Sequence, residues 1–367
     1  MPWVGSVTDQ RRGFVSLLEQ GVPLAEACRR FGISRPTGHK WKSRFQEQGG
    51  EGLIDQSRRP ASSPARTGPH METLVCEVRH DHPVWGGRKI RAFLLRQGRL
   101  RVPAASTITQ ILRRNGLLGP LEPARPAEFL RFEAPAPNHR WQIDFKGHFG
   151  LTDGNRCHPL GILDDHSRYN LCLKACLDQK TVTVKAHLEE TFRLYGLPHS
   201  ILADNGPPWG NTQPGFRWTP LSVWLLDLGI GVTHSRPRHP QTVGKQERFH
   251  LTLDLEVLTI QPRWETLLRV QGAFDEWQPI YNTQRPHQGI GLQVPSDRYQ
   301  PSPRSFPTTL PPLDYPSGWT KRTVDAAARI TINHQRIKVG KPFIGRTVAL
   351  SPDTGTIYYR TTPIRNV

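Results

Sequence analysis

The fold is decided by residues 141–177, which read WQIDFKGHFGLTDGNRCHPLGILDDHSRYNLCLKACL. Apolar and polar residues alternate through Trp141–Gly150, and two further runs, 156–165 and 169–177, are rich in apolar residues. The sequence Asp165-His166-Ser167 joins the last two runs and is typical of a turn. The stretch therefore predicts three strands that form an antiparallel meander.

Downstream of this meander, helical and extended patterns alternate. Helices are predicted over residues 180–195, 220–228 and 243–258, and short buried strands over 200–203 and 230–234. An alternation of this kind is typical of an α/β layer structure, in which helices pack on a mixed sheet. Residues 141–300 are therefore predicted to form one α/β core.

A helical segment at residues 1–55 precedes the core. On its third predicted helix, Thr37, Trp41 and Phe45 recur every four residues and should face the other two helices. The free side of this helix is then basic, with Arg35, His39, Lys40 and Lys42. This layout indicates a helix-turn-helix domain whose last helix enters the major groove of DNA, although a three-helix bundle with a solvated basic face is the alternative.

The remaining segments flank the core with further basic charge. Residues 71–118 predict a second helix-turn-helix-like domain, in which phosphate contacts or simple solvation suit the basic side chains Arg88, Lys89, Arg113 and Arg114. Proline-rich residues 119–140 and 301–318 are predicted linkers. Residues 319–367 contain four short alternating runs, which predict a small all-β, barrel-like domain. The protein is therefore expected to be multidomain, with all-α, α/β and all-β parts in that order.

The charge of the chain indicates its partner. Among 367 residues, 49 are Lys or Arg and 31 are Asp or Glu, so the formal net charge is +18. Residues 141–300 hold equal numbers of acids and bases, so the excess lies in the flanks. A charge of this size predicts a nucleic-acid partner. The sequence has no apolar run long enough to predict a membrane span, and no secretory leader is evident. A cytoplasmic, nucleoid-associated protein is therefore expected.

Three acids lie on different predicted elements of the core. Asp144 is within the first strand, Asp204 follows a short buried strand in an Asp-Asn-Gly turn, and Glu247 is on the last helix. Taken singly, each has an ordinary explanation as a paired strand acid, a turn residue or a surface salt bridge. Asp144 fits that explanation least, because apolar neighbours would bury its charge.

Four short motifs follow one another through the core: Trp141-Gln142-Ile143-Asp144, Leu163-Asp164-Asp165-His166-Ser167-Arg168, Ala203-Asp204-Asn205-Gly206, and His239-Pro240-Gln241 with Gly244-Lys245-Gln246-Glu247-Arg248. In this order and at these separations they resemble the integrase-core transposases of bacterial insertion sequences, which are relatives of retroviral integrases. The resemblance continues through Trp277–Tyr299 and extends to the paired N-terminal helical units, so it covers nearly the whole chain.

The resemblance implies a ribonuclease H-like core with a catalytic, metal-binding triad of Asp144, Asp204 and Glu247. Carboxylates are the oxygen ligands that two Mg²⁺ or Mn²⁺ ions require, and such an ion pair suits cleavage of a phosphodiester and transfer of its 3′ hydroxyl. The expected partners are the terminal inverted repeats of the element, target DNA and at least one further copy of the chain. Basic residues near the acids are expected to line the DNA approach, although a role only in helix solubility is the alternative: Arg236, Arg238, His239, Lys245, Arg248 and His250.

Two features depart from the family pattern. Asp204 and Glu247 have 42 residues between them, a longer separation than is usual, and the surface loop 207–218 accounts for the excess. Val243 stands just ahead of Gly244, where relatives usually have Asn. The alternative interpretation is a non-catalytic helix-turn-helix regulator or an inactive transposase remnant. A recombinase with a covalent Ser or Tyr intermediate finds no support beyond ordinary Ser and Tyr content.

Overall fold

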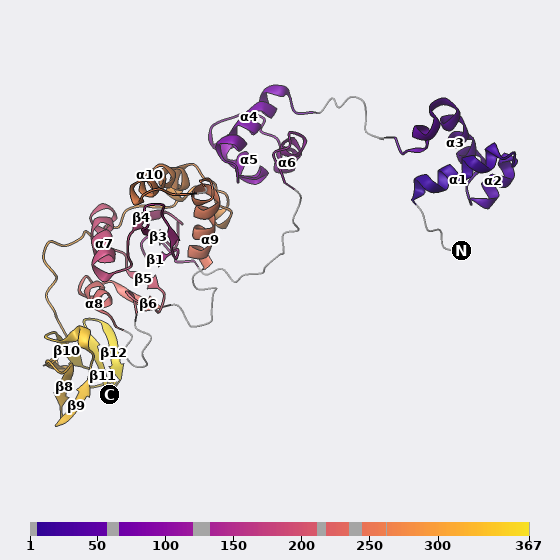
Figure 1. Ribbon diagram of the computed structural model, residues 1–367. Helices are drawn as coiled ribbons and strands as arrows, with labels where there is room; N and C mark the ends of the chain where they lie inside the picture. Colours follow the sequence, from indigo (N-terminus) through magenta and orange to yellow (C-terminus); the bar gives the residue numbers. More distant parts are fainter. Residues whose placement is uncertain are drawn as a thin grey trace. The chain divides into compact units, whose positions relative to one another are not determined.

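The computed structural model describes residues 6–56, 66–119, 133–210, 218–234, 244–261 and 263–366 (Figure 1). The chain forms two compact units, Met1–Arg66 and Thr67–Val367. Over the described residues, no helix combines the length and the apolar character that crossing a membrane requires.

The first unit is a small helical domain built from α1 (Val7–Glu19), α2 (Leu24–Arg30), α3 (Arg35–Gln48) and the 3₁₀ helix η1 (Gly49–Leu53). Phe14, Cys28 and Trp41 are buried in its core. Gly38 is also buried, and a Cβ added there would lie 2.4 Å from the Cys28 sulfur, so α2 and α3 require glycine where they meet. The predicted helical domain is confirmed, with Gly38 rather than Thr37 at the helix contact.

The second unit begins with three helices, α4 (Pro69–Asp81), α5 (Gly87–Arg96) and α6 (Ala105–Arg114). Trp85 is fully buried among apolar residues of all three helices. Two ion pairs join this bundle to the core: Lys89 Nζ lies 3.9 Å from Glu256 Oε1, and Arg96 forms two hydrogen bonds of 2.7 Å with the Asp297 carboxylate. The bundle therefore contacts the core through α5.

The core follows the predicted alternation. Its elements are β1 (Arg140–Phe145), β2 (Phe149–Gly150), β3 (Arg156–Asp164), β4 (Asn170–Cys176), α7 (Thr181–Tyr195), β5 (Ser200–Ala203), α8 (Pro220–Asp227), β6 (Gly231–His234), α9 (Gly244–Leu253), the π-helical turn η3 (Asp254–Leu258) and α10 (Leu267–Thr283). The short 3₁₀ helices η4 (Gln288–Ile290) and η5 (Pro295–Asp297) follow. The mixed α/β core is confirmed.

The core sheet has the order β4–β3–β1–β5–β6, and β2 pairs with the beginning of β3. The predicted meander is antiparallel, with β3 between β1 and β4, whereas β5 and β6 run parallel to β1. One apolar cluster joins the sheet to α7 and α8, and another joins it to α9 and α10. The two pairs of helices therefore cover opposite faces of the sheet, as Figure 1 shows.

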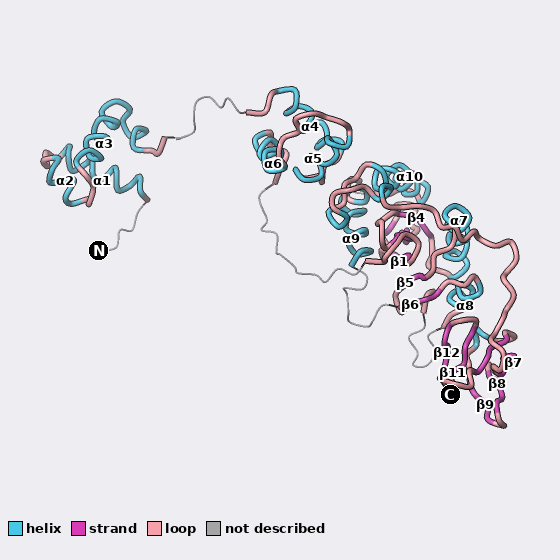
Figure 2. Tube along the Cα trace, turned by 180° about the vertical axis from the view of Figure 1, so that it is seen from behind, coloured by secondary structure: helices cyan, strands magenta, loops and turns pink. Residues whose placement is uncertain are grey.

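Helix α8 is apolar on two sides because it packs between two cores. Leu221 and Leu225 contact the sheet of the core, whereas Val223 and Leu226 contact the C-terminal domain. The neighbouring Asp227 is buried, where it accepts hydrogen bonds from Arg346 Nη1 (2.7 Å) and the Tyr359 hydroxyl. The C-terminal domain is thus fixed to α8, and Figure 2 shows the two side by side.

The C-terminal domain contains a four-stranded sheet of order β12–β11–β10–β7 and a β8–β9 hairpin. Its elements are β7 (Thr320–Thr323), β8 (Arg329–Ile332), β9 (Gln335–Lys338), the 3₁₀ helix η6 (Lys341–Phe343), β10 (Thr347–Leu350), β11 (Thr356–Tyr359) and β12 (Thr362–Asn366). The all-β prediction is confirmed as small antiparallel sheets. Strands β7 and β12 were not expected, because both lack an alternating apolar pattern.

The predicted linker at 301–318 has neither helix nor strand, but it is attached to the core. Ser302 N donates to Tyr195 O (2.8 Å), and Arg304 Nη1 donates to Pro198 O (2.6 Å). Phe306 packs against Phe192 of α7. This segment therefore extends the core before the chain enters the C-terminal domain. Most of the other predicted linker, 119–140, lies outside the described residues.

Candidate active site

Strand β1 presents alternate residues to the two helical layers. Trp141 and Ile143 are buried in the cluster that includes α7 and α8. Because successive side chains of a strand point to opposite faces, Gln142 and Asp144 face the other layer, which contains α9. Gln246 of α9 confirms that this helix lies there, because its Nε2 donates to the carbonyl oxygens of Gln142 (3.1 Å) and Gly161 (3.0 Å). Asp144 is thus directed toward α9.

The strand register brings Asp204 beside Asp144. Strands β1 and β5 are parallel, and Gln142 is paired with Leu202. Asp144 is two residues further along β1, and Asp204 follows β5 directly, so the two acids lie on one face and at one level of the sheet. The Asp204 carboxylate accepts a hydrogen bond from Gly206 N (3.1 Å), so the predicted turn orients it.

Glu247 lies at the beginning of α9, where two buried contacts fix the helix. Gln246 is fully buried against β1 and β3. Lys245 Nζ lies 2.5 Å from the Asp165 carboxylate and donates to Asp165 O (3.2 Å) in the β3–β4 turn. Glu247 follows these anchors directly and is itself exposed. The two contacts therefore hold the acidic turn of α9 at the sheet edge where Asp144 and Asp204 lie.

The charges of Asp204 and Glu247 act on the Asp144 carboxyl group. Burial, together with the negative charges of Asp204 and, to a lesser extent, Glu247, raises the pKa of Asp144 to about 7. Burial also raises the pKa of Asp204. The charges of two acids that are remote from Asp144 in the sequence therefore reach its carboxyl group.

Within the described part of the chain, His250 is the one basic residue that pairs with Asp144, and its Nδ1 lies 4.0 Å from Asp144 Oδ2. Burial, reinforced by the Lys146 charge, lowers the pKa of His250 to about 4, so the imidazole is neutral near pH 7. The site therefore concentrates negative charge that a bound cation would compensate.

The donor set of this site fits a hard divalent cation, since it consists of carboxylates with no thiol. The acids are nevertheless not drawn into a closed group. Among the residues with described positions, no set of three or more His, Cys, Asp or Glu side chains is arranged to hold a metal ion. The arrangement is open, and the charges of Asp204 and Glu247 act on Asp144.

Models of known protein families match this region of the chain. Residues 134–240 and 228–295 match two models that are both described as an integrase core domain. The chain carries an integrase core. Residues 10–61 match a helix-turn-helix domain, and residues 37–112 match a homeodomain-like domain. The predicted combination of helix-turn-helix units with an integrase core is thereby confirmed.

Solved structures similar to this chain include retroviral integrases. The HTLV-2 integrase catalytic core domain in complex with magnesium is 15% identical over 46% of this chain and 100% of its own, with a TM-score of 0.35. The catalytic core domain of BIV integrase is 22% identical over 44% and 92%, with a TM-score of 0.33. The simian T-cell lymphotropic virus intasome, in complex with PP2A regulatory subunit B56 gamma, is 16% identical over 80% and 99%, with a TM-score of 0.38.

The basic residues predicted to contact DNA near the integrase core have different environments. Lys245 is largely enclosed by its pair with Asp165, whereas Arg248 is exposed. His250 faces Asp144. The other positions singled out there lie outside the described residues: Arg236, Arg238, His239 and Val243. Lys245 therefore anchors α9. The local sequence does not indicate this role, because its partner Asp165 lies 80 residues earlier in the chain.

The basic residues of the second helical bundle also differ from one another. Arg88 and Arg113 are exposed. Arg114 pairs with Glu72 of α4, and Lys89 is enclosed beside Glu256 of the core. Burial lowers the pKa of Lys89 to about 8. Lys89 is thus the one member of this set that is enclosed rather than exposed.

All four basic residues predicted on the third helix of the first unit are exposed: Arg35, His39, Lys40 and Lys42. We expect replacement of both Lys40 and Lys42 by Ala to weaken DNA binding and to reduce the slope of log K against log salt by about 2, since each phosphate contact contributes about 0.9. Fluorescence anisotropy over a salt series measures this slope. Lys180→Ala with Lys185→Ala on the core is the matched control, and an unchanged slope in the Lys40/Lys42 variant would assign DNA binding to another face.

Proposed function

We propose that the protein is a DDE transposase of a bacterial insertion sequence, which cuts DNA at the element ends and joins the 3′ hydroxyl to target DNA. The observation that carries this proposal is the register of β1 and β5, which aligns Asp144 with Asp204 beside the helix that bears Glu247. An acidic site of this kind, in an integrase core with helix-turn-helix domains, suits phosphodiester chemistry.

In this proposal Asp144, Asp204 and Glu247 together hold two Mg²⁺ or Mn²⁺ ions. When bound, the ions supply activation of the attacking oxygen and stabilisation of the leaving oxygen. The protein contributes the position of the carboxylates: Asp144 and Asp204 are fixed by paired strands, and Glu247 by the buried anchors of α9. No side chain of the triad becomes attached to DNA, because the nucleophile is first water and then a DNA 3′ hydroxyl.

The helix-turn-helix units bind the terminal inverted repeats in this proposal, and the core acts on both the ends and the target. Two element ends must be held together during transfer, so the active species contains at least two copies of the chain on DNA. The basic flanks, which carry the net charge of +18, supply attraction to the DNA backbone.

One observation favours a second candidate, a non-catalytic DNA-binding regulator or inactive remnant. The described acids are not gathered into a closed metal-binding group. Against this candidate, acids are intact at all three positions of the triad. A decayed active site is under no requirement to keep three charged side chains on three separate elements.

Metal removal separates the two candidates. We expect the full-length protein, incubated with labelled DNA that carries the inverted repeats flanking its gene, to cleave and join strands in Mg²⁺ or Mn²⁺ and to lose both reactions in EDTA. Gel analysis of the products measures both reactions. Tight binding to the ends with no strand cleavage in either metal would contradict the transposase and favour the regulator. A covalent protein–DNA adduct would instead indicate a Ser or Tyr recombinase.

A further inference from the structure

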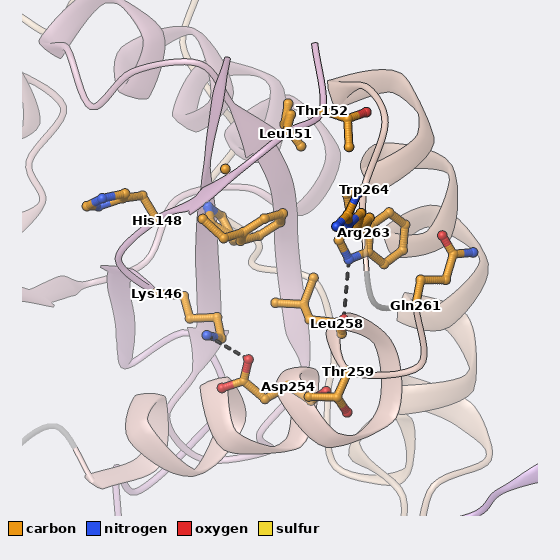
Figure 3. A pocket seen from close by; sticks show the side chains of 13 residues that line it. Lys146, His148, Leu151, Thr152, Asp254, Leu258, Thr259, Gln261, Arg263 and Trp264 are labelled. Carbon is orange, nitrogen blue, oxygen red and sulfur yellow. Dashed lines mark hydrogen bonds and ion pairs between the residues drawn. The ribbon is translucent and has the colours of Figure 1, made fainter. Parts of the chain in front are cut away.

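A groove of about 550 Å³ lies next to the acidic site, between the chain that follows β1, the β2–β3 hairpin and the end of η3 (Figure 3). Apolar residues such as Phe149, Leu151 and Leu258 contribute much of its lining, and polar side chains are set among them: Lys146, Thr152, Asp254, Gln261 and Arg263. Figure 3 shows Lys146 and Asp254 reaching toward each other at one end of the groove. The triad does not account for this groove.

The groove continues the acidic site along the contact between β1 and α9. Lys146 N bonds to Pro159 O (3.0 Å), so the chain is still extended there and Lys146 shares the strand face of Asp144. On the helix, His250 lies opposite Asp144 at 4.0 Å, and one turn later Asp254 lies opposite Lys146 at 2.7 Å. Asp254 is seven positions after Glu247, which corresponds to roughly 10 Å along a helix, or about three nucleotide steps of one DNA strand.

Two lysines flank the acids, and their ion pairs differ. Lys245 is locked, because Asp165 is only 6% exposed and also accepts hydrogen bonds from Ala134 N (2.7 Å) and Gln142 Nε2 (2.6 Å). Lys146 is paired with Asp254, whose side chain is 37% exposed and lies at the groove. Lys146 itself is 19% exposed, but its acid faces the solvent of the groove, so a stronger anion can replace Asp254 as its partner.

We propose that this groove holds the sugar–phosphate backbone of the DNA strand next to the reacting phosphate, with Lys146 as the phosphate ligand and Asp254 as its resting partner. This inference rests on the proposed transposase function. Arg263 adds a second cation to the groove, and Gln261 adds an amide donor. Such groups suit phosphate and sugar oxygens and carry no base specificity, so the groove positions DNA without reading its sequence.

The two partners of the ion pair should affect DNA binding in opposite directions. We expect Lys146→Met to weaken binding about tenfold at low salt and to reduce the salt slope by about 1, whereas Lys146→Arg keeps both values near those of the parent. Asp254→Asn should strengthen binding a few-fold, because it frees Lys146. The measurement is fluorescence anisotropy of full-length protein with a labelled forked DNA of arbitrary sequence, with divalent metal omitted.

Another lysine–acid pair provides the matched control. Lys174 of β4 lies 3.3 Å from Glu190 of α7, on the other helical layer of the core. We expect Lys174→Met and Glu190→Gln to leave the binding curves unchanged. The gain from Asp254→Asn should disappear when Lys146→Met is also present, because the acid acts through the lysine. If the stronger binding persists in the double variant, Asp254 acts only through its general negative charge, and the proposed pairing with Lys146 is wrong.

The binding assay distinguishes failure of this subsite from failure of the transposase proposal. If the parent cuts and joins DNA but Lys146→Met binds like the parent at every salt concentration, the groove is not a DNA subsite. If the parent never cuts DNA but Lys146→Met still reduces the salt slope, the subsite remains and the enzymatic proposal is wrong. Thermal unfolding of each variant identifies a binding loss that is due to misfolding, and recovery with Lys146→Arg excludes that cause.

Discussion

Asp204→Asn is expected to abolish metal-dependent strand cleavage and strand transfer while leaving the binding of element ends unchanged. The substitution keeps the size of the side chain and an oxygen that can accept the Gly206 N–H, so the turn after β5 should persist. It removes the charge that the proposed metal site requires. The loss of transition-state stabilisation should be about 4 kcal/mol or more, which corresponds to about a thousandfold in rate.

The assay compares strand-transfer products of the parent and the variant at equal occupancy of labelled ends. Asp275→Asn is the matched control, because Asp275 is an exposed acid on α10 of the same core and bonds only to Gln271 among the hydrogen bonds described for it. Parent-like transfer by Asp204→Asn would remove this residue from the mechanism. Loss of activity together with loss of end binding would indicate a folding defect rather than loss of a metal ligand.

Much of the core was predictable from local patterns, because strands and helices here carry regular apolar periods. The meander of β1, β3 and β4 and helix α7 follow such patterns closely. The C-terminal domain was less predictable. Strand β7, Thr320–Thr323, is polar throughout and mostly exposed, and β12 contains Pro363 at the sheet edge, so neither shows the alternation that identifies a strand.

The identities of the acids were predictable, but their arrangement was not. Spacing along the chain cannot indicate that β5 lies parallel to β1 or that Gln142 is paired with Leu202, and this register is what aligns Asp144 with Asp204. The partner of the Lys245 side chain could not be predicted from the sequence either. In the sequence, Lys245 lies near a proposed metal ligand on a basic helix, which favours a DNA contact. The structure instead pairs it with Asp165, which belongs to a turn far away in the sequence.

The role of Lys245 leads to a second large expected effect. We expect Lys245→Met to lower the free energy of unfolding of the core by about 3 kcal/mol, because it leaves the Asp165 carboxylate buried without its cation. Burial by itself would raise the pKa of Asp165, but the Lys245 charge holds that pKa below its usual value. Strand transfer should also fall, since the acidic turn of α9 loses one of its two anchors. Urea denaturation and the transfer assay measure these two effects.

The same variant separates anchoring from DNA contact. If Lys245 were a phosphate ligand, Lys245→Met would reduce the salt slope of DNA binding by about 1 and leave the urea midpoint unchanged. If Lys245 is an anchor, the variant should lower the urea midpoint and leave the salt slope unchanged. Adding Asp165→Asn to Lys245→Met should recover much of the lost stability, because the uncompensated charge is removed while the amide oxygen can still accept from Ala134 N. Recovery of stability without recovery of strand transfer would mean that the ion pair does more than stabilise the core: it sets the position of Glu247.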